Sequence, residues 1–383
     1  MPPRLRKNKA GNIRARFIDG GVGKRGSGVG KAPPTAQDYY EKGVVALAKL
    51  EPELAIEFLK KSLELDPTHL SSMDLYAEAC IQIGEHSEAV SVLLKALSAD
   101  VDSNYSRWLT LAQLQCSHDS LKSYQYGLSI MLAKIAAADI SEVEKQKLRH
   151  ECAQVYASMG ELYLTDLCYE EDAEVLCERY IHSALEQDPI GLDGLQSMAS
   201  LRLSQKRSSE ATTIMQHIFT RTTELRSQHK RLGIIQELKS ESNDEAVHDV
   251  PTIEFSLQTA KLLIECSKEL PILSSNAIDL LTDLLNDDDE NIEVWYTLGI
   301  AALELTPPDH EFARYHLERA QRMMKTVLEQ AGPANFPFTE EMKLIEENLE
   351  QLGPQENDGI MKQDMDDVMD EADEEWSTDE EIS

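Results

Sequence analysis

The side chains that could perform catalysis are scattered along this chain and form no recognisable constellation. Its ten histidines include no HExxH pair and no HxE followed by PCxxC, which are spacings that zinc enzymes use. His310, Glu311 and His316 come closest to a metal cluster, but Pro307-Pro308 predicts a turn around the first two. No GxSxG or GxxxxGK[ST] sequence is present. We therefore predict that the protein is not an enzyme and has no metal or other cofactor.

Two short segments resemble binding motifs but lack the context that such motifs need. Gly21–Gly26 fits the dinucleotide pattern GxGxxG, yet no predicted strand precedes it and no βαβ unit surrounds it. Asp287–Asp289 lacks the glycine and the terminal glutamate of a calcium loop, so we predict a solvated turn. The six cysteines include no CxxC pair and are expected to be reduced, mostly as small apolar fillers of helices.

Charge is the most informative property of this sequence. The formal net charge is −32 at pH 7, and it is unevenly distributed. Residues 1–31 carry nine Lys/Arg and one acid, residues 353–383 carry thirteen acids and one lysine, and residues 32–352 therefore hold −28. A body this acidic repels nucleic-acid backbones and attracts basic partners. No run approaches the roughly 18 apolar residues of a membrane span. We therefore expect no membrane as a partner, and no nucleic acid bound directly in a groove of this acidic body.

The elements that would position these charges follow a period of 34 residues. Small residues and the end of the second helix recur at this interval. Gly43, Ala55, Ser62 and Pro67 are followed 34 residues later by Ala77, Ala89, Ala96 and Val101. Trp108-x-x-Leu111-Ala112 and Trp295-x-x-Leu298-Gly299 open two later copies. This pattern resembles the tetratricopeptide repeat (TPR) family, in which helix-turn-helix units stack because one unit cannot bury its apolar face alone.

About seven units and a capping helix are predicted, which defines an all-α superhelical solenoid. The first two units lie at 36–67 and 70–101, and the third begins at Trp108. The fourth includes Tyr156 and Cys177 and ends at Pro189, and the fifth begins at Leu192. The sixth lies at 253–287, the seventh begins at Trp295, and the amphipathic helix at 338–352 would cap the open end. Three segments follow: a disordered basic Gly-rich arm (1–34), the solenoid with its cap (35–352) and a disordered acidic tail (353–383).

The resemblance to TPR proteins implies a set of groove-facing residues, because certain positions of the first helix of each repeat usually line the concave side. Reading these positions gives carboxylates with interleaved amide and aromatic side chains: Tyr40, Asp74, Glu78, Gln82, Gln113, Glu161, Asp193, Gln196, Glu293, Tyr296 and Glu304. An extended segment rich in Lys and Arg would find charge-assisted hydrogen bonds there. The clamp by which some TPR proteins grip a chaperone's carboxylate is excluded, since Tyr40, Val44, Asp74 and Glu78 occupy its positions.

The two terminal segments each allow two interpretations. The basic arm is either an import signal or RNA-contacting segment, or a solubilising tail. In the acidic tail, Trp376 stands alone among carboxylates. The tail is predicted to contact a partner, either the basic ligand of the groove from outside or, through Trp376, an import or ribosomal factor; alternatively the tail only prevents aggregation.

The basic arm, the seven units with an irregular sixth, the cap and the acidic tail together resemble a family of fungal chaperones dedicated to large-subunit ribosomal protein four. The resemblance implies that the groove captures the long, basic internal loop of a newly made ribosomal protein and delivers the client to nuclear pre-ribosomes. The protein would then work in cytoplasm and nucleus. Two alternatives remain at this stage: a histone chaperone, or a TPR scaffold subunit of a multiprotein complex. The sequence alone fixes neither the client and its direction in the groove, nor the oligomeric state, nor the register of the sixth unit.

Overall fold

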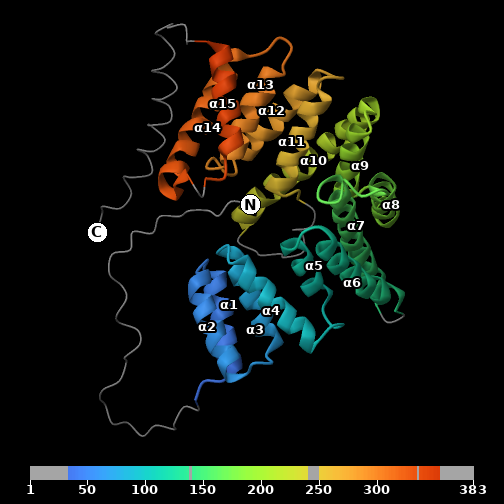
Figure 1. Ribbon diagram of the computed structural model, residues 1–383, viewed down its shortest axis with the longest axis vertical. Coiled ribbons are helices and arrows are strands. Elements are labelled where there is room, and N and C mark those ends of the chain that lie inside the picture. The colour runs from blue at the N-terminus through green and yellow to red at the C-terminus, as the bar shows by residue number, and fades with distance from the viewer. Residues whose placement is uncertain (1–32, 138–139, 240–249, 334–335, 354–383) are drawn as a thin grey trace, which may run out of the picture. The chain divides into compact units, whose positions relative to one another are not determined.

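The computed structural model describes residues 33–137, 140–239, 250–333 and 336–353, without side chains at 232–239 (Figure 1). The predicted basic arm lies outside the described residues except for its last two positions. The predicted acidic tail, with Trp376, lies outside them after Gly353.

Every regular element in the described part of the chain is an α-helix (Figure 1). The fifteen helices are α1 (Ala36–Ala48), α2 (Pro52–Leu65), α3 (Leu70–Gln82), α4 (His86–Ala99), α5 (Tyr105–Leu114), α6 (Ser117–Ala136), α7 (Glu142–Leu164), α8 (Ala173–Gln187), α9 (Leu192–Ser204), α10 (Ser208–Lys239), α11 (Ile253–Cys266), α12 (Ile272–Leu285), α13 (Ile292–Leu303), α14 (His310–Ala331) and α15 (Thr339–Leu352). None of these helices is long and apolar enough to cross a membrane.

In chain order α1 to α14 make up seven successive two-helix units, and α15 follows them and packs on α14. This confirms the predicted all-α class, the seven helix-turn-helix units and the capping helix. The small residues at the 34-residue interval are buried, since Ala55, Ala77, Ala89 and Ala96 are at most 1% exposed. Small side chains at these positions let the two helices of a unit, and neighbouring units, approach closely.

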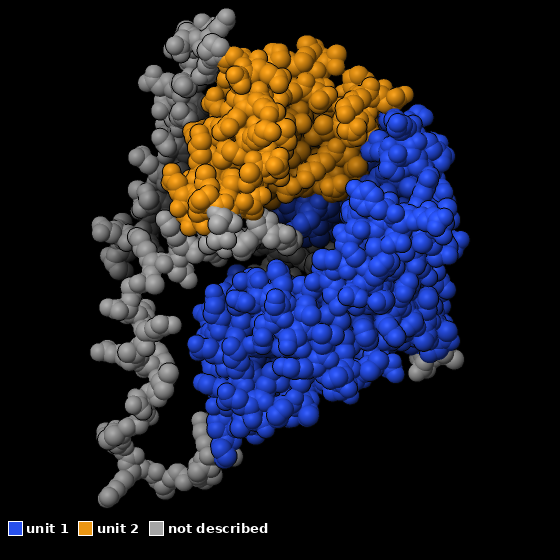
Figure 2. Space-filling model, viewed as in Figure 1, with its two compact units in different colours: residues 1–255 blue, residues 256–383 orange. Residues whose placement is uncertain are grey.

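The chain divides into two compact units, residues 1–255 and 256–383, with the boundary inside α11 (Figure 2). In the first unit, one apolar cluster joins α1 to α5 around Leu59 and Leu93, and a second joins α5 to α9 around Met159 and Ile181. In the second unit, a cluster around Leu317 joins α13, α14 and α15. Each unit therefore has its own hydrophobic core.

Gly299 marks a close approach between α13 and α14. A Cβ atom at this position would lie 2.5 Å from Cγ of Leu317 on α14 and 3.3 Å from the Ala313 carbonyl oxygen. Because Leu317 is fully buried, it has no free space into which it could move. The glycine in the Trp295-x-x-Leu298-Gly299 sequence is therefore required by packing between α13 and α14.

We expect Gly299→Val to lower the free energy of unfolding of the second unit by about 1–3 kcal/mol, the usual cost of overpacking a filled core. Urea unfolding followed by circular dichroism measures this change. Ala48→Val, at an exposed position of α1, is the control and should shift the midpoint little. Equal midpoints for the two variants would contradict the close-packing interpretation.

The turn predicted around His310 and Glu311 is wrong. Helix α14 begins at His310, because the Asp309 side chain caps it by accepting a hydrogen bond from the Phe312 backbone N–H (3.0 Å). His316 is buried, with Nδ1 2.8 Å from the Phe312 carbonyl oxygen, and burial lowers the pKa of its imidazole. No group of three potential ligands gathers into a metal site in the described part of the chain.

Candidate binding surface on the first helices of the repeats

All the groove residues predicted from the sequence lie on the first helices of the repeats or at their ends. Tyr40 is on α1, three are on α3 (Asp74, Glu78, Gln82), Gln113 is on α5, Glu161 on α7, two are on α9 (Asp193, Gln196), and two are on α13 (Glu293, Tyr296), with Glu304 at its C-cap. Within the first unit α1 contacts α3, and α7 contacts α9. In these two cases successive first helices are therefore neighbours, as a shared binding face requires.

Polar side chains join successive first helices at several places, and we call four of these, whose partners lie 32 to 39 positions apart, the inter-repeat contacts. They are His69 Nε2 to Gln37 Oε1 (3.2 Å), Arg107 to Asp74 (2.7 and 3.0 Å), Gln154 Nε2 to Asp193 Oδ2 (3.3 Å) and Lys261 Nζ to Glu293 Oε1 (2.5 Å). The paired residues are 32 to 39 positions apart, which is about one repeat. Three of the predicted groove carboxylates are therefore already engaged inside the chain.

Asp74 makes the most extensive of these contacts. Arg107 donates from Nε and Nη2 to both oxygens of Asp74, in the bidentate geometry that favours strong ion pairs. Arg107 is only 6% exposed, and its Nη1 lies 3.5 Å from Asp100. The hydrogen bonds to Asp74 raise the pKa of the guanidinium above its usual value. The negative charge of Asp74 is thus compensated by a buried cation, and we assign it to holding α3 against α5.

Glu78 and Glu161 differ from Asp74 because neither forms an ion pair with another described residue. Both side chains are exposed. Glu78 lies one turn beyond Asp74 on α3, and Glu161 lies on α7 beside Asp193 of α9. Their charges are available to a partner that contacts the first helices.

The environment of Glu161 reduces the hydration of its carboxyl group. Its side chain is accessible to water, yet loss of hydration among neighbouring protein atoms raises the pKa of the carboxyl, and Asp193 raises it further. Tyr124 of α6 is buried nearby, and the charge of Glu161 contributes to its raised pKa after desolvation. A carboxylate that is both accessible and partly dehydrated gains more from an incoming cation than a fully hydrated one.

We expect Glu161→Gln to stabilise the first unit at neutral pH. A folded-state pKa raised above the unfolded value of 4.5 means that the ionised carboxylate costs stability above that pH, and that this cost disappears as pH falls below it. The melting temperature of the Glu161→Gln variant should therefore exceed that of the parent protein at pH 7 but not near pH 4. Glu78→Gln, at an exposed position of α3, serves as the control and should change the melting temperature less. A lower melting temperature for Glu161→Gln at pH 7 would contradict this account.

The remaining predicted residues divide between surface and core. Gln82, Gln113 and Glu304 are exposed. Gln196 is half-buried and donates to the Phe255 carbonyl oxygen (3.1 Å). Tyr296 is half-buried in the cluster of α13, α14 and α15, where burial and then Glu341 raise the pKa of its phenol. Tyr296 is therefore partly a packing residue of the second unit.

Tyr40 lies where the first two repeats meet. Its half-buried ring packs beside His69, the N-cap residue of α3, with ring centroids 5.5 Å apart. It therefore also supports the junction between repeats.

Sequence reasoning missed the cations that compensate the predicted carboxylates. Arg107 lies 33 positions after Asp74, and Lys261 lies 32 positions before Glu293. Oppositely charged residues about one repeat apart on first helices could have predicted these two ion pairs. Glu151 was also missed: it lies on α7 and accepts a hydrogen bond from the Tyr105 hydroxyl (2.7 Å).

Comparison with known proteins supports both the fold and the resemblance predicted from the sequence. The tetratricopeptide repeat family matches residues 36–69. A protein of Schizosaccharomyces pombe named "Probable assembly chaperone of rpl4" is 28% identical over 259 residues, which are 66% of this chain and 69% of that protein. A protein of Emericella nidulans with the same name is 25% identical over 314 residues, which are 78% of this chain and 72% of that protein.

A solved structure has the same fold. "Assembly Chaperone of RpL4 (Acl4) (Residues 1-338)" superposes with a TM-score of 0.53 at 22% identity, and the match covers 76% of this chain and 99% of that one. The successive helix pairs, the 34-residue interval and the family match at residues 36–69 show that this chain has a TPR fold. The chain is similar to proteins named assembly chaperones of rpl4, the resemblance that the sequence predicted.

Proposed function

We propose that this protein is a dedicated assembly chaperone that binds a basic, extended segment of a newly made ribosomal protein of the rpl4 type. The two curated relatives that carry this name support the client class. The observation that carries the proposal is the pair of exposed carboxylates Glu78 and Glu161, which have no ion-pair partner among the described residues and lie on the first helices of a body whose sequence carries −28.

The physical chemistry of such a client explains why this surface is useful. A flexible cationic extension binds any polyanion it meets before assembly. An acidic surface supplies counter-charge until ribosomal RNA, with its denser phosphate charge, displaces the chaperone. Binding, shielding and release need no catalytic group, so the role we propose is not enzymatic. It places the protein in the cytoplasm, where the client is made, and in the nucleus, where pre-ribosomes assemble; an import factor would be a further partner.

Affinity capture of the full-length protein from a cell lysate, at low and at moderate salt, tests the client class. Mass spectrometry should identify one ribosomal protein of the rpl4 type, and its recovery should fall as the salt concentration rises because exposed charges are screened. Histones as the captured proteins would overturn the proposal in favour of a histone chaperone. A large assembly that resists salt would overturn it in favour of a scaffold subunit.

A further inference from the structure

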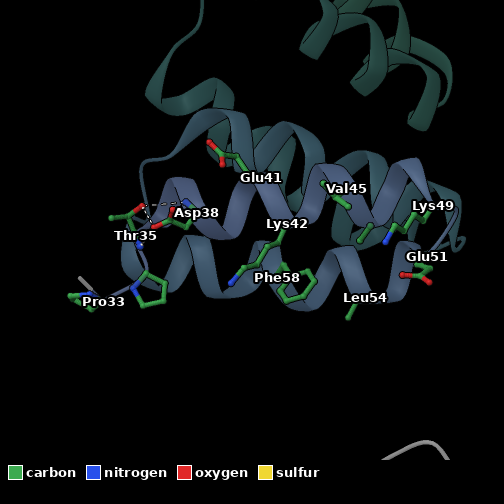
Figure 3. A pocket seen from close by; sticks show the side chains of 12 residues that line it. Pro33, Thr35, Asp38, Glu41, Lys42, Val45, Lys49, Glu51, Leu54 and Phe58 are labelled. Atoms are coloured by element: carbon green, nitrogen blue, oxygen red, sulfur yellow. Dashed lines mark hydrogen bonds between the residues drawn. The ribbon is translucent and has the colours of Figure 1, made fainter. Parts of the chain in front are cut away.

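The last helix pair is covered by a further helix, whereas the first helix pair has an open groove. At the C-terminal end α15 buries Ile345 completely in the cluster that contains Trp295 and Leu317. At the N-terminal end a groove of about 750 Å³ runs between α1 and α2 and is open on the outer side of this pair (Figure 3). No described residue precedes Pro33, which itself lines the groove. The first repeat therefore shows the face that a preceding repeat would cover.

The second repeat shows what such a face looks like when it is covered. Val45 in the groove is 53% exposed, whereas Ala79, its equivalent 34 positions later, is fully buried. Phe58 is half-buried in the groove, whereas its equivalent Val92 is 4% exposed. Helix α2 packs against α3 and covers this face of the second repeat. The groove between α1 and α2 is thus an unfilled packing site of the repeat architecture.

The lining of the groove defines the chemistry of its occupant. Val45, Leu54 and Phe58 supply apolar side chains to the lining, and the close view shows Val45 on α1 and Leu54 and Phe58 on α2 (Figure 3). Three carboxylates line the groove as well, from Asp38, Glu41 and Glu51, against two ammonium groups. An occupant with both apolar and basic side chains fits this combination, because apolar surface is buried while the charges pair at the edge.

We propose that residues 13–18 of this same chain occupy the groove and serve as its N-terminal cap. The segment reads Ile-Arg-Ala-Arg-Phe-Ile, so it supplies Ile13, Phe17 and Ile18 for the apolar part of the lining and two arginines for the carboxylates. It belongs to the part of the sequence with nine Lys/Arg and one acid. The acidic tail is a poorer occupant, since its thirteen carboxylates would meet those of the groove.

The chain length permits this contact. Residues 19–32 connect the segment to Pro33, and an extended chain covers about 3.3 Å per residue, so the linker spans up to roughly 45 Å. Thirteen helical residues of α1 extend for about 20 Å at 1.5 Å per residue. The segment can therefore reach every part of the groove. This inference concerns the first repeat only and does not depend on the proposed client.

Site-specific photo-crosslinking of the full-length protein tests the contact. p-Benzoylphenylalanine replaces Phe17, the purified protein is irradiated, and crosslinked peptides are identified by mass spectrometry after trypsin digestion. The expected product joins position 17 to peptide 43–49 or 50–60 of the same molecule, with a yield that does not change on dilution. The same probe at Trp376 in the acidic tail is the matched control and should not label these peptides.

The groove variant Val45→Glu/Leu54→Glu should abolish the crosslink from position 17, while circular dichroism shows unchanged helix content. Both substituted side chains are exposed, so this variant should fold. Three outcomes would overturn the proposal. They are labelling of other helices, a groove crosslink that survives in the groove variant, and a groove crosslink found only in species of doubled mass, which would identify a second copy as the occupant.

Discussion

The double variant Glu78→Lys/Glu161→Lys is expected to lose at least a hundredfold in affinity for the basic segment of an rpl4-type client. Both carboxylates are exposed and make no ion pair among the described residues, so each can accept a charge-assisted hydrogen bond from the client. Such bonds contribute about 1.5–3 kcal/mol each, and 1.4 kcal/mol corresponds to a factor of ten in affinity. The new lysines also repel a cationic guest. Fluorescence anisotropy with a labelled client segment, at about 0.1 M salt, measures the change.

Glu57→Lys/Glu64→Lys is the matched control for this experiment. These exposed glutamates lie on α2, the second helix of the first repeat, and the variant changes the net charge by the same amount. Its affinity should fall only slightly through the weaker overall field. Similar losses in both variants would show that net charge alone attracts the client. Undiminished binding by the Glu78/Glu161 variant would remove both residues from the binding surface.

The second large effect concerns stability. Asp74→Ala is expected to lower the free energy of unfolding of the first unit by about 3 kcal/mol, near the lower end for a broken buried ion pair because Asp74 is itself partly exposed. The variant leaves the guanidinium of Arg107, 6% exposed, with only Asp100 at 3.5 Å. Urea unfolding followed by circular dichroism measures the loss.

Replacing both Asp74 and Arg107 distinguishes a stabilising role of Asp74 from a role in client binding. Arg107→Met combined with Asp74→Ala removes the uncompensated cation and should recover much of the lost stability. If Asp74→Ala unfolds like the parent protein but binds the client weakly, Asp74 contacts the client and our assignment is wrong. For this reason Asp74 does not belong in a charge-reversal test of the binding surface.

The sequence predicts the helix pairs well because their signal is local and repeated. Small residues such as Ala55 and Ala89 must recur where helices meet, and the sixth unit could be located from Ala277, Leu281 and Leu284, all fully buried. Assigning free carboxylates was harder, because a position on a first helix does not tell whether a cation from the next repeat reaches it. Asp74 and Glu78 are one turn apart, yet only Asp74 meets an arginine.

Two further features could not be read from short-range patterns. Pro307-Pro308 predicted a turn at His310, but Asp309 provides a cap, and the helix begins there. The crowding around Glu161 depends on the distance between α7 and α9 rather than on neighbours in the sequence.

The inter-repeat contacts make the junctions that carry them specific to the units they join. The four junctions use different chemical partners: imidazole with amide, guanidinium with carboxylate, amide with carboxylate, and ammonium with carboxylate. A gene in which two repeats had been exchanged would keep every apolar position of the 34-residue pattern but would place mismatched polar groups at the new junctions. The units are thus alike in shape but not interchangeable, and duplication or loss of one unit would require compensating substitutions in its neighbours.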